Sequence, residues 1–484
     1  MNLLVNAPSF CGTMTAPSSK SHTIRALICA SLAESPSFIT APLISGDMES
    51  AIQALRQLGV TITEVSHKPL TLKVTPPARG LLSFAEGAVN TGQNSEYSEQ
   101  GNIPFGHGGK RSGQDEELLL NLGNSGSLLY FLGMILAAAK TPVCLTGDES
   151  LRSRPAAPLL SVYRQAGISY SAAKPDSDTR STDVPPRFCG PLPAGNYQLD
   201  GPFSQPVTGL LFTAPLLNGM SRITFNKAGE RPYLRMTCDW LRIAGITLTH
   251  GGFDTDTCSF EIAGNQRYQP FRTTIPGDWS SALFPLTAAV ICNAALTLTN
   301  LDPADTQGDS RALSILQSMG ADIRCDAERR TVSVFPISGT LRGGRFDCGD
   351  IPDAVPILAA AAVFCSGQTL LTNAGVCRFK ECDRLAASAE ELAKFGAHIV
   401  QGENFLRIDG SGGTGLHPAQ VRSRGDHRIA MMLAVAACGI AETSCIEDFD
   451  CVKISYPRFI EDMNAAGAVF KVQTHQAVCE YPAE

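Results

Sequence analysis

Six basic residues of this 484-residue chain fall near the expected N-termini of helices, where a cation is electrostatically unfavourable. The positive end of a helix dipole opposes each cation by a few tenths to about 1 kcal/mol. For any single case, an exposed helix face screened by salt is the alternative explanation. The six residues are Lys20, Arg25, Arg154, Lys380, Arg384 and Arg428. Together they predict a cleft for one or two substrates with several negative groups, because Arg offers paired N–H groups and Lys a point charge.

Small or polar residues stand at the starts of several helices in the same pattern. They would leave backbone N–H groups free to bind an anion. Ordinary N-capping is the alternative for each of them, but the neighbouring basic residues favour binding. These residues are Ser21, Gly126 with Ser127, Ser204 with Gln205, Ser280, Asp353 and His427.

The elements that position these residues come from an internal repeat. An amphipathic helix pattern that ends in Gly and leads into a strand recurs six times, as in ALRQLGVTI and ELAKFGAHI. Successive glycines are 108, 78, 75, 76 and 71 residues apart, and a polar run at about 88–115, expected to be a disordered insertion, lengthens the first interval. The glycines suit the left-handed position that ends a helix. They are Gly59, Gly167, Gly245, Gly320, Gly396 and Gly467.

A more apolar helix pattern precedes each amphipathic one, as in DAVPILAAAAVFC. A helix that is apolar nearly all round is buried, so each repeat is expected to contain one inner helix, one outer helix and β-rich segments. The predicted fold class is therefore α/β, built from six repeats. Two domains of three repeats suit a chain of this length better than one solenoid.

Composition narrows the classes of function. The net charge of −7, from 46 acidic and 39 basic residues, argues against a general nucleic-acid binder. The 16 cysteines are scattered without Cys-x-x-Cys pairs, so we expect reduced thiols in a cytoplasmic protein. The start, MNLLVNAPSFCGTM, has no basic residue before its apolar run and is expected to form a strand rather than a secretory signal. No membrane segment is expected either.

Nine motifs, in order along nearly the whole chain, resemble the 5-enolpyruvylshikimate-3-phosphate synthase (3-phosphoshikimate 1-carboxyvinyltransferase) family. They are PSSKSHTIRAL at Pro17, LGNSGS at Leu122, RSRP at Arg152, LDGPFSQ at Leu199, RPY at Arg231, IPDA at Ile351, KECDR at Lys380, GDHRIAM at Gly425 and SYPRF at Ser455. The resemblance implies a two-domain enolpyruvyl transferase-like fold of six βαβαββ-type repeats, three per domain, with the active site between the domains. The first domain is expected at residues 18–271 and the second at residues 1–17 and 272–484.

The resemblance also implies the reaction. The family transfers the enolpyruvyl group of phosphoenolpyruvate to the 5-hydroxyl of shikimate 3-phosphate and releases phosphate (EC 2.5.1.19), a step of the shikimate pathway toward chorismate and the aromatic amino acids. The expected partners are these two small molecules, without nucleic acid or membrane. No metal or organic cofactor is implied, and the expected form is a cytoplasmic monomer.

Individual roles follow from the same resemblance. The implied catalytic residues are Lys20, Asp353 and Glu381, with Asp353 as the base for the hydroxyl and Glu381 as the proton donor to C3. Two carboxylates can divide these roles where their environments separate their pKa values. Phosphoenolpyruvate is expected to contact Lys20, Gly126, Arg154, Arg384 and Arg428. Shikimate 3-phosphate is expected to contact Ser21, Arg25, Ser204, Gln205, Tyr233, Asp353 and Lys380.

Several positions depart from the family pattern, and together they predict an altered acceptor pocket. Glu230 replaces a serine beside the expected phosphate pocket, and we expect its carboxylate to pair with Arg231 or to turn away. The other departures are Ser18, Tyr130, Phe203, Val376 and Ile454. Two alternatives stay open: a non-catalytic or altered-acceptor relative, and a UDP-N-acetylglucosamine enolpyruvyl transferase. Glu149 opposes the second, because it stands where that enzyme has a loop cysteine.

Overall fold

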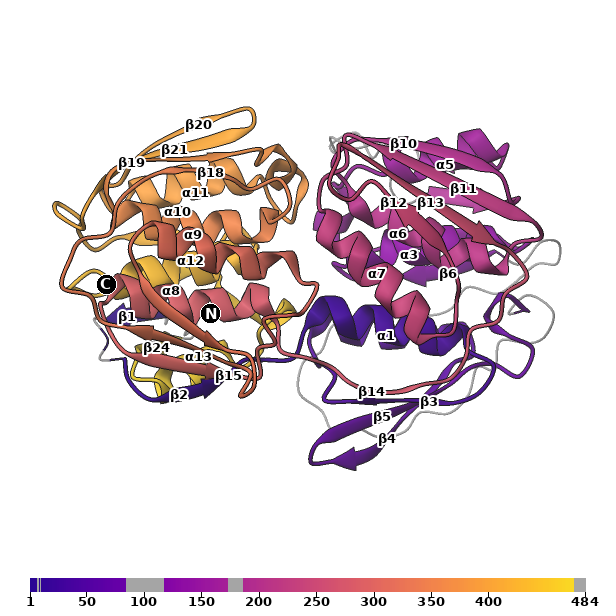
Figure 1. Cartoon of the computed structure of the whole chain (residues 1–484), viewed down its shortest axis with the longest axis horizontal. Helices are drawn as coiled ribbons and strands as arrows, with labels where there is room; N and C mark the ends of the chain where they lie inside the picture. Colours follow the sequence, from indigo (N-terminus) through magenta and orange to yellow (C-terminus); the bar gives the residue numbers. More distant parts are fainter. Residues whose placement is uncertain (7, 9, 84–116, 173–185, 474–484) are drawn as a thin grey trace, which may run out of the picture.

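The computed structural model describes residues 1–6, 8, 10–83, 117–172 and 186–473, so the insertion expected at about 88–115 lies outside the described residues. Buried apolar side chains form two separate cores, one in each of the two lobes in Figure 1. The first core draws on residues 24–275, and the second on residues 3–16 and 279–470. None of the described helices combines the length and apolar character needed to cross a membrane.

Three four-stranded sheets belong to the first lobe, on the right in Figure 1. One has the strand order β14 (Arg272–Thr274), β3 (Ser37–Thr40), β5 (Leu70–Thr75) and β4 (Thr61–His67). The next has the order β6 (Leu118–Asn121), β7 (Pro142–Thr146), β9 (Pro186–Cys189) and β8 (Ser169–Ala172). The last has the order β10 (Asn196–Asp200), β11 (Met220–Asn226), β13 (Thr257–Ala263) and β12 (Thr249–Gly251).

Three further sheets belong to the second lobe. The N-terminal strand lies inside one of them, in the order β22 (Gln420–Arg422), β23 (Ser444–Glu447), β1 (Asn2–Asn6) and β24 (Val469–Gln473). Another has the order β16 (Asp322–Asp326), β17 (Thr331–Phe335), β15 (Leu296–Thr299) and β2 (Thr13–Thr15). The third has the order β18 (Arg345–Asp347), β19 (Ser366–Thr372), β21 (Phe405–Ser411) and β20 (His398–Gly402).

Each sheet is accompanied by one inner and one outer helix. The inner helices are α1 (Lys20–Leu32), α3 (Gly126–Ala137), α6 (Ser204–Thr213), α8 (Trp279–Ile291), α10 (Val355–Val363) and α12 (His427–Cys438). The outer helices are α2 (Gly46–Gln57), α5 (Ala157–Ala166), α7 (Arg231–Ile243), α9 (Ala312–Ser318), α11 (Arg384–Ala393) and α13 (Phe459–Ala465). Short turns complete the described part: α4 (Glu149–Arg152), η1 (Leu81–Ser83), η2 (Ala214–Leu216), η3 (Gly308–Arg311), η4 (Pro352–Ala354), η5 (Gly375–Phe379) and η6 (Phe449–Ile454).

The two kinds of helix differ as their sequences predict. Every residue of α10 and α12 is buried, which suits helices that are apolar nearly all round. Helix α7, by contrast, buries Trp240 and Leu241 and exposes Arg235 and Arg242. The six repeat glycines all have φ between 68° and 107°. This left-handed conformation is unfavourable for residues with a Cβ, and it confirms the predicted ends of the outer helices.

The strand pairing confirms the predicted order of the repeat. In the unit that contains α6 and α7, β10 pairs in parallel with β11, and β13 pairs antiparallel with both β11 and β12. The chain therefore runs β-α-β-α-β-β within this unit. The same order holds for the units of α3 and α5 and of α10 and α11.

The two lobes exchange strands at the points where the chain passes between them. Strand β2 precedes α1 of the first lobe but pairs with β15 of the second, and β14 precedes α8 of the second lobe but pairs with β3 of the first. The domain boundary predicted after residue 271 therefore falls before β14, which completes a first-lobe sheet. The crossing segments are bonded to each other: Ser19 N–H donates to Pro276 O (2.8 Å), and Asp278 N–H donates to Pro17 O (2.7 Å).

Candidate active site

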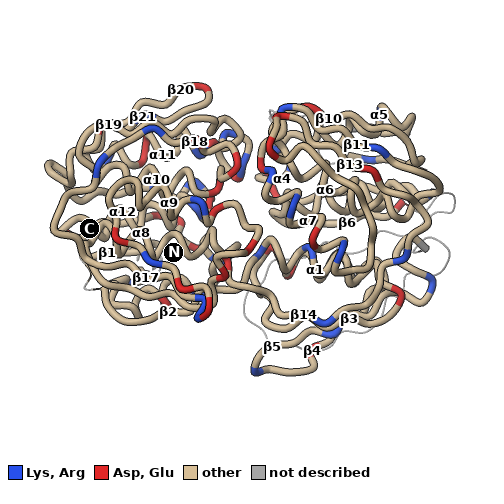
Figure 2. The backbone as a smooth tube through the Cα atoms, in the orientation of Figure 1, with Lys and Arg blue, Asp and Glu red and all other residues tan. Residues whose placement is uncertain are grey.

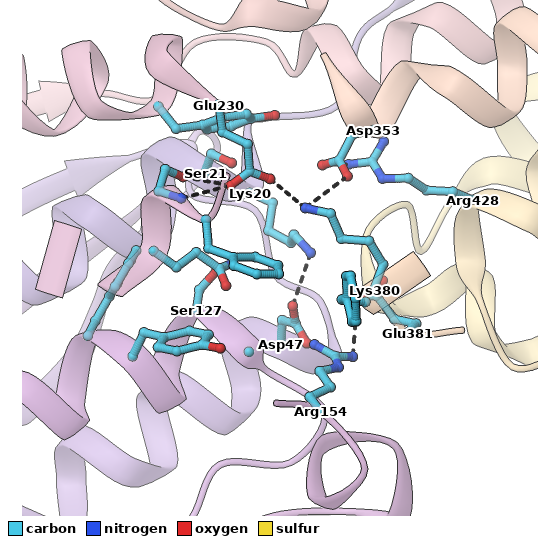
Figure 3. A pocket seen from close by; sticks show the side chains of 18 of the residues that line it. Lys20, Ser21, Asp47, Ser127, Arg154, Glu230, Asp353, Lys380, Glu381 and Arg428 are labelled. Carbon is cyan, nitrogen blue, oxygen red and sulfur yellow. Dashed lines mark hydrogen bonds and ion pairs between the residues drawn. The ribbon is translucent and has the colours of Figure 1, made fainter. Parts of the chain in front are cut away.

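A cavity between the two lobes collects the charged residues that the sequence singles out. Figure 2 shows Lys, Arg, Asp and Glu gathered where the lobes face each other, and Figure 3 shows the cavity itself. Six Lys or Arg side chains and four Asp or Glu side chains line it, which gives the lining a formal charge of +2. Its volume is about 90 Å³.

All thirteen predicted site residues line this cavity. The inner helices α1, α3, α6 and α12 contribute residues from their first turns, η4 contributes Asp353, and the segment from η5 to α11 contributes three residues. The thirteen are Lys20, Ser21, Arg25, Gly126, Arg154, Ser204, Gln205, Tyr233, Asp353, Lys380, Glu381, Arg384 and Arg428. Ser280, at the start of the inner helix α8, does not line the cavity; its hydroxyl donates to Asp309.

Arg384 lies at the centre of the second-lobe half of the site. It is the first residue of α11, and 1% of its side chain is exposed. Its guanidinium donates from Nη1 to Asp353 Oδ1 (2.8 Å), from Nη2 to Glu381 Oε2 (2.5 Å) and from Nε to Asp426 Oδ2 (2.7 Å). A buried guanidinium is stable when such partners compensate for its lost hydration. Arg384 therefore fixes the separation of the two predicted proton-transfer carboxylates.

Asp353 is surrounded by cations. Its Oδ2 accepts from Arg428 Nη2 (2.8 Å), and Lys380 Nζ is 3.9 Å from Oδ1, in addition to the bond from Arg384. Burial opposes ionisation, but Arg428, Lys380 and Arg384 outweigh it and hold the pKa of Asp353 below its usual range. The carboxyl is thus ionised and able to accept a proton.

Glu381 is also ionised in this arrangement. Burial again opposes ionisation, but Arg384 and then Arg154 outweigh it, so the pKa of Glu381 lies well below the ordinary value. Arg154 Nη2 is 3.5 Å from Glu381 Oε1, across the boundary between the lobes. The pKa of this carboxyl therefore depends on cations that an anionic ligand would also bind.

The first-lobe cations have their own protein partners. Lys20 Nζ lies 3.1 Å from Asp47 Oδ2, and Arg154 Nη2 donates to Asn124 Oδ1 (2.7 Å). Gly126, at the start of α3, passes close to Arg154: a Cβ at this glycine would lie 2.7 Å from Arg154 Nη1. The absence of a side chain thus lets a guanidinium reach the helix N-terminus, where both groups can bind one anion.

Arg25 is held on the side of the cavity nearest α7. It is buried, and it donates from Nε to Thr237 Oγ1 (3.0 Å) and from Nη1 to Ser21 O (3.0 Å). Burial lowers the pKa of Arg25 to about 10, so the group stays positive at neutral pH. Gln205 also lines the cavity, and its Nε2 donates to Ser127 Oγ (3.0 Å) in the first turn of α3.

The carboxylate of Glu230 pairs with residues distant in the sequence rather than with its neighbour Arg231. Its Oε1 accepts from Lys380 Nζ (2.6 Å), and its Oε2 accepts from the backbone N–H (3.1 Å) and hydroxyl (2.9 Å) of Ser204. The expectation that Glu230 pairs with Arg231 or turns away is wrong in both alternatives, because its carboxylate faces the cavity and Arg231 forms a two-bond pair with Asp350 (3.1 and 2.7 Å). Consecutive residues at a helix start project in different directions, so these two side chains reach different partners.

Two residues important to this geometry, Asp47 and Asp426, carry no predicted role, and a third, His427, is predicted only as a helix start that could bind an anion. Asp47 and Asp426 are the partners of Lys20 and Arg384, and His427 lines the cavity as a buried ring with neither nitrogen bonded. Burial holds the pKa of His427 well below its usual range, so the ring is neutral. The N-cap pattern before α12 could have identified Asp426 as a cap, but not as the partner of Arg384. Among the described residues, no cluster of His, Cys, Asp and Glu could hold a metal ion.

The fold and the cleft define the class of protein first. The chain superposes on a solved EPSP synthase from Acinetobacter baumannii with a TM-score of 0.70 and 24% identity, over 98% of this chain and 100% of the other. It superposes on the enolpyruvyl transferase NikO from Streptomyces tendae with a TM-score of 0.72 and 17% identity, over 97% and 98%. This is the enolpyruvyl transferase fold, as predicted.

Sequence comparison narrows the class to one family. A model of the family EPSP synthase (3-phosphoshikimate 1-carboxyvinyltransferase) matches residues 7–98 and 90–463. A 3-phosphoshikimate 1-carboxyvinyltransferase from Methanothrix thermoacetophila is 35% identical over 477 residues, 98% of this chain and 100% of the relative. One from Acetivibrio thermocellus is 34% identical over 468 residues, 97% of this chain and 99% of the relative. The chain belongs to this family, which confirms the resemblance found in its motifs.

Proposed function

We propose that the cavity transfers the enolpyruvyl group of phosphoenolpyruvate to the 5-hydroxyl of shikimate 3-phosphate and releases phosphate. The chain belongs to the family that carries this activity, so it is an enzyme of the shikimate pathway. One observation carries the assignment to this cavity: the four predicted phosphoenolpyruvate-binding cations and both predicted proton-transfer carboxylates line the same space. The four cations are Lys20, Arg154, Arg384 and Arg428.

Phosphoenolpyruvate would bind by replacing protein carboxylates as the partner of these cations. Lys20 pairs with Asp47, Arg154 with Glu381, and Arg428 with Asp353. The phosphate and carboxylate of the substrate offer the same cations stronger, multiply bonded partners, and Gly126 adds the N-terminus of α3. The cations are therefore held in position before the substrate arrives.

Asp353 would act as the base for the acceptor hydroxyl. Addition joins the 5-oxygen of the acceptor to C2 of the enolpyruvyl group, while a proton is added at C3 to form a tetrahedral ketal. A carboxylate that is ionised at neutral pH and adjoins the acceptor side of the cavity suits the first transfer. Its three cationic neighbours limit its basicity, and the arrival of a second anion beside them would raise it.

Glu381 would supply the proton to C3, and this role requires a change in its pKa. The carboxyl is ionised while Arg384 and Arg154 face it. When phosphoenolpyruvate binds, its negative charge engages these same arginines, and the carboxyl loses much of the field that favours its ionised form. Protonation of Glu381 is thus coupled to substrate binding.

The breakdown of the ketal reverses only the proton transfer at C3, where the proton returns to Glu381, while the proton taken from the 5-hydroxyl leaves with the phosphate. C3 loses a proton as the C2–O bond to phosphate breaks, which restores the double bond and releases phosphate. Lys20 and the arginines would stabilise the charge that develops on the leaving oxygen, because they are already oriented before the reaction. We further propose that the enzyme acts as a monomer, since one chain supplies both halves of the cavity. We place it in the cytoplasm without a nucleic-acid partner, against which its net charge of −7 argues.

The direct test is the release of inorganic phosphate by the purified full-length chain from phosphoenolpyruvate, with shikimate 3-phosphate as the acceptor. We expect equal amounts of phosphate and enolpyruvyl product. The controls omit the acceptor or replace it with UDP-N-acetylglucosamine, and both should give no release. The proposed function would be refuted if only UDP-N-acetylglucosamine supported turnover, or if neither acceptor did.

A further inference from the structure

Glu230 stands at an unusual point of the backbone. It precedes α7 with φ 51° and ψ 31°, a left-handed conformation that a residue with a side chain seldom adopts outside functional or tightly constrained sites. Its side chain does not cap its own helix. The carboxylate turns into the cavity, and 4% of the residue is exposed. The buried charge is therefore directed at the site (Figure 3).

The partners of this carboxylate form a complete anion-binding set. Lys380 supplies a cation, the Ser204 hydroxyl a neutral donor, and the Ser204 backbone N–H the positive end of α6. Helix α6 has no side-chain cap from its own N-cap residue, Phe203, so its N-terminus is available to an external anion. Under the proposed function, Ser204 and Lys380 bind the phosphate of the acceptor. A protein carboxylate thus occupies the place of that phosphate.

Two basic residues beside Glu230 are already engaged by carboxylates. Arg231 is bound to Asp350, and Lys380 Nζ, at 2.6 Å from Glu230 Oε1, is 3.9 Å from Asp353. The adjoining surface is apolar, because the rings of Phe203 and Phe379 pack edge to face with centroids 5.7 Å apart. A phosphate that enters beside Glu230 would therefore meet a negative charge that already engages Lys380 and Ser204, which opposes binding.

We propose that Glu230 is an internal counter-anion that occupies the acceptor-phosphate subsite and must be displaced before shikimate 3-phosphate binds. The proposal rests on the proposed function. It makes Glu230 a specificity-determining residue, because the carboxylate competes only with acceptors that carry an anion at this position. Since Glu230 belongs to the first lobe and Lys380 to the second, the pair also bridges the lobes across the cavity.

Glu230→Ser and Glu230→Gln test the competition. Loss of the charge should lower the KM for shikimate 3-phosphate, and its Kd by calorimetry, about ten-fold or more. The KM for phosphoenolpyruvate should change little, because its cations do not contact Glu230. The ratio of kcat/KM for shikimate 3-phosphate to that for unphosphorylated shikimate should rise by a similar factor. Glu230→Gln keeps the size of the side chain and provides a second test if the serine variant folds poorly.

Asp350→Asn is the matched control. It also removes a carboxylate from an ion pair between the lobes, with Arg231, but Asp350 contacts neither Lys380 nor Ser204. The KM for shikimate 3-phosphate should stay within about two-fold of the parent value, because the subsite keeps its internal anion. If Asp350→Asn lowers this KM as much as Glu230→Ser does, the effect comes from a weaker contact between the lobes. The proposed competition between Glu230 and the acceptor phosphate would then be overturned.

The remaining outcomes separate this inference from the proposed function. If the parent is active and both Glu230 variants have an unchanged or higher KM for shikimate 3-phosphate, only the inference is overturned. A parent without turnover refutes the proposed function, whereas tighter binding of shikimate 3-phosphate by the variants still supports the inference. If parent and variants differ neither in turnover nor in binding of shikimate 3-phosphate, the inference is overturned; if the parent is also inactive, the proposed function is refuted as well.

Discussion

Asp426 offers a sharp test of how the site is held together, because it was identified only through its contacts. No part of it is exposed. Its Oδ1 caps α12 by accepting from the backbone N–H groups of Arg428 (2.8 Å) and Ile429 (3.4 Å), and its Oδ2 accepts from Arg384 Nε (2.7 Å). Asp426→Asn keeps an oxygen for the cap but removes the charge that faces Arg384.

The expected loss follows from the burial of this pair. Removing one partner of a buried ion pair costs about 3–5 kcal/mol, and Arg384 keeps Asp353 and Glu381, so we expect about 3 kcal/mol here. Urea unfolding followed by tryptophan fluorescence measures the change, because the two tryptophans, Trp240 and Trp279, lie in different lobes. The KM for phosphoenolpyruvate should also rise about ten-fold, since Arg384 loses one of its three constraints.

Asp383→Asn is the matched control. Asp383 is likewise an aspartate N-cap, on α11, where Oδ1 accepts from Ala386 N–H (3.0 Å) and Oδ2 pairs with Arg378 (2.5 Å). Its side chain is 37% exposed, so the same change should cost about 1 kcal/mol or less. Equal losses in the two variants would refute the argument that the buried pair organises the site.

Two further predictions concern proton transfer and pH. Glu381→Gln should lower kcat about 10²–10⁴-fold with little change in substrate Kd, whereas Glu390→Gln on the exposed face of α11 should leave kcat near the parent value. Asp309 should make stability fall as pH rises from about 4 to about 7, because burial raises its pKa to about 7 and the folded state binds its proton more tightly than the unfolded chain does. Asp309→Asn should therefore raise the urea midpoint at pH 8 but not at pH 4, and a gain of equal size at both pH values would contradict the assignment.

The repeated elements could be predicted because their signals are local. The helix-ending glycines, such as Gly59 and Gly467, mark a backbone conformation that depends on the residue itself, and the apolar pattern of α10 determines its burial on every side. The cations at helix starts, such as Arg384, could also be recognised, since each conflicts with the dipole of its own helix. Each of these features depends on residues that lie within a few positions of one another in the sequence.

The pairing of those cations depended on the tertiary structure. Lys380 meets Glu230, 150 positions away, and Arg231 meets Asp350, 119 positions away, because two lobes with exchanged strands face each other there. From the sequence alone, Glu230 was expected to pair with Arg231 or to turn away from the site, and neither is the case. Sequence by itself determined which residues carry charge and on which elements they stand. Which charges neutralise one another was decided only by the packing of the lobes, because ion pairs depend on distances in space that no local periodicity encodes.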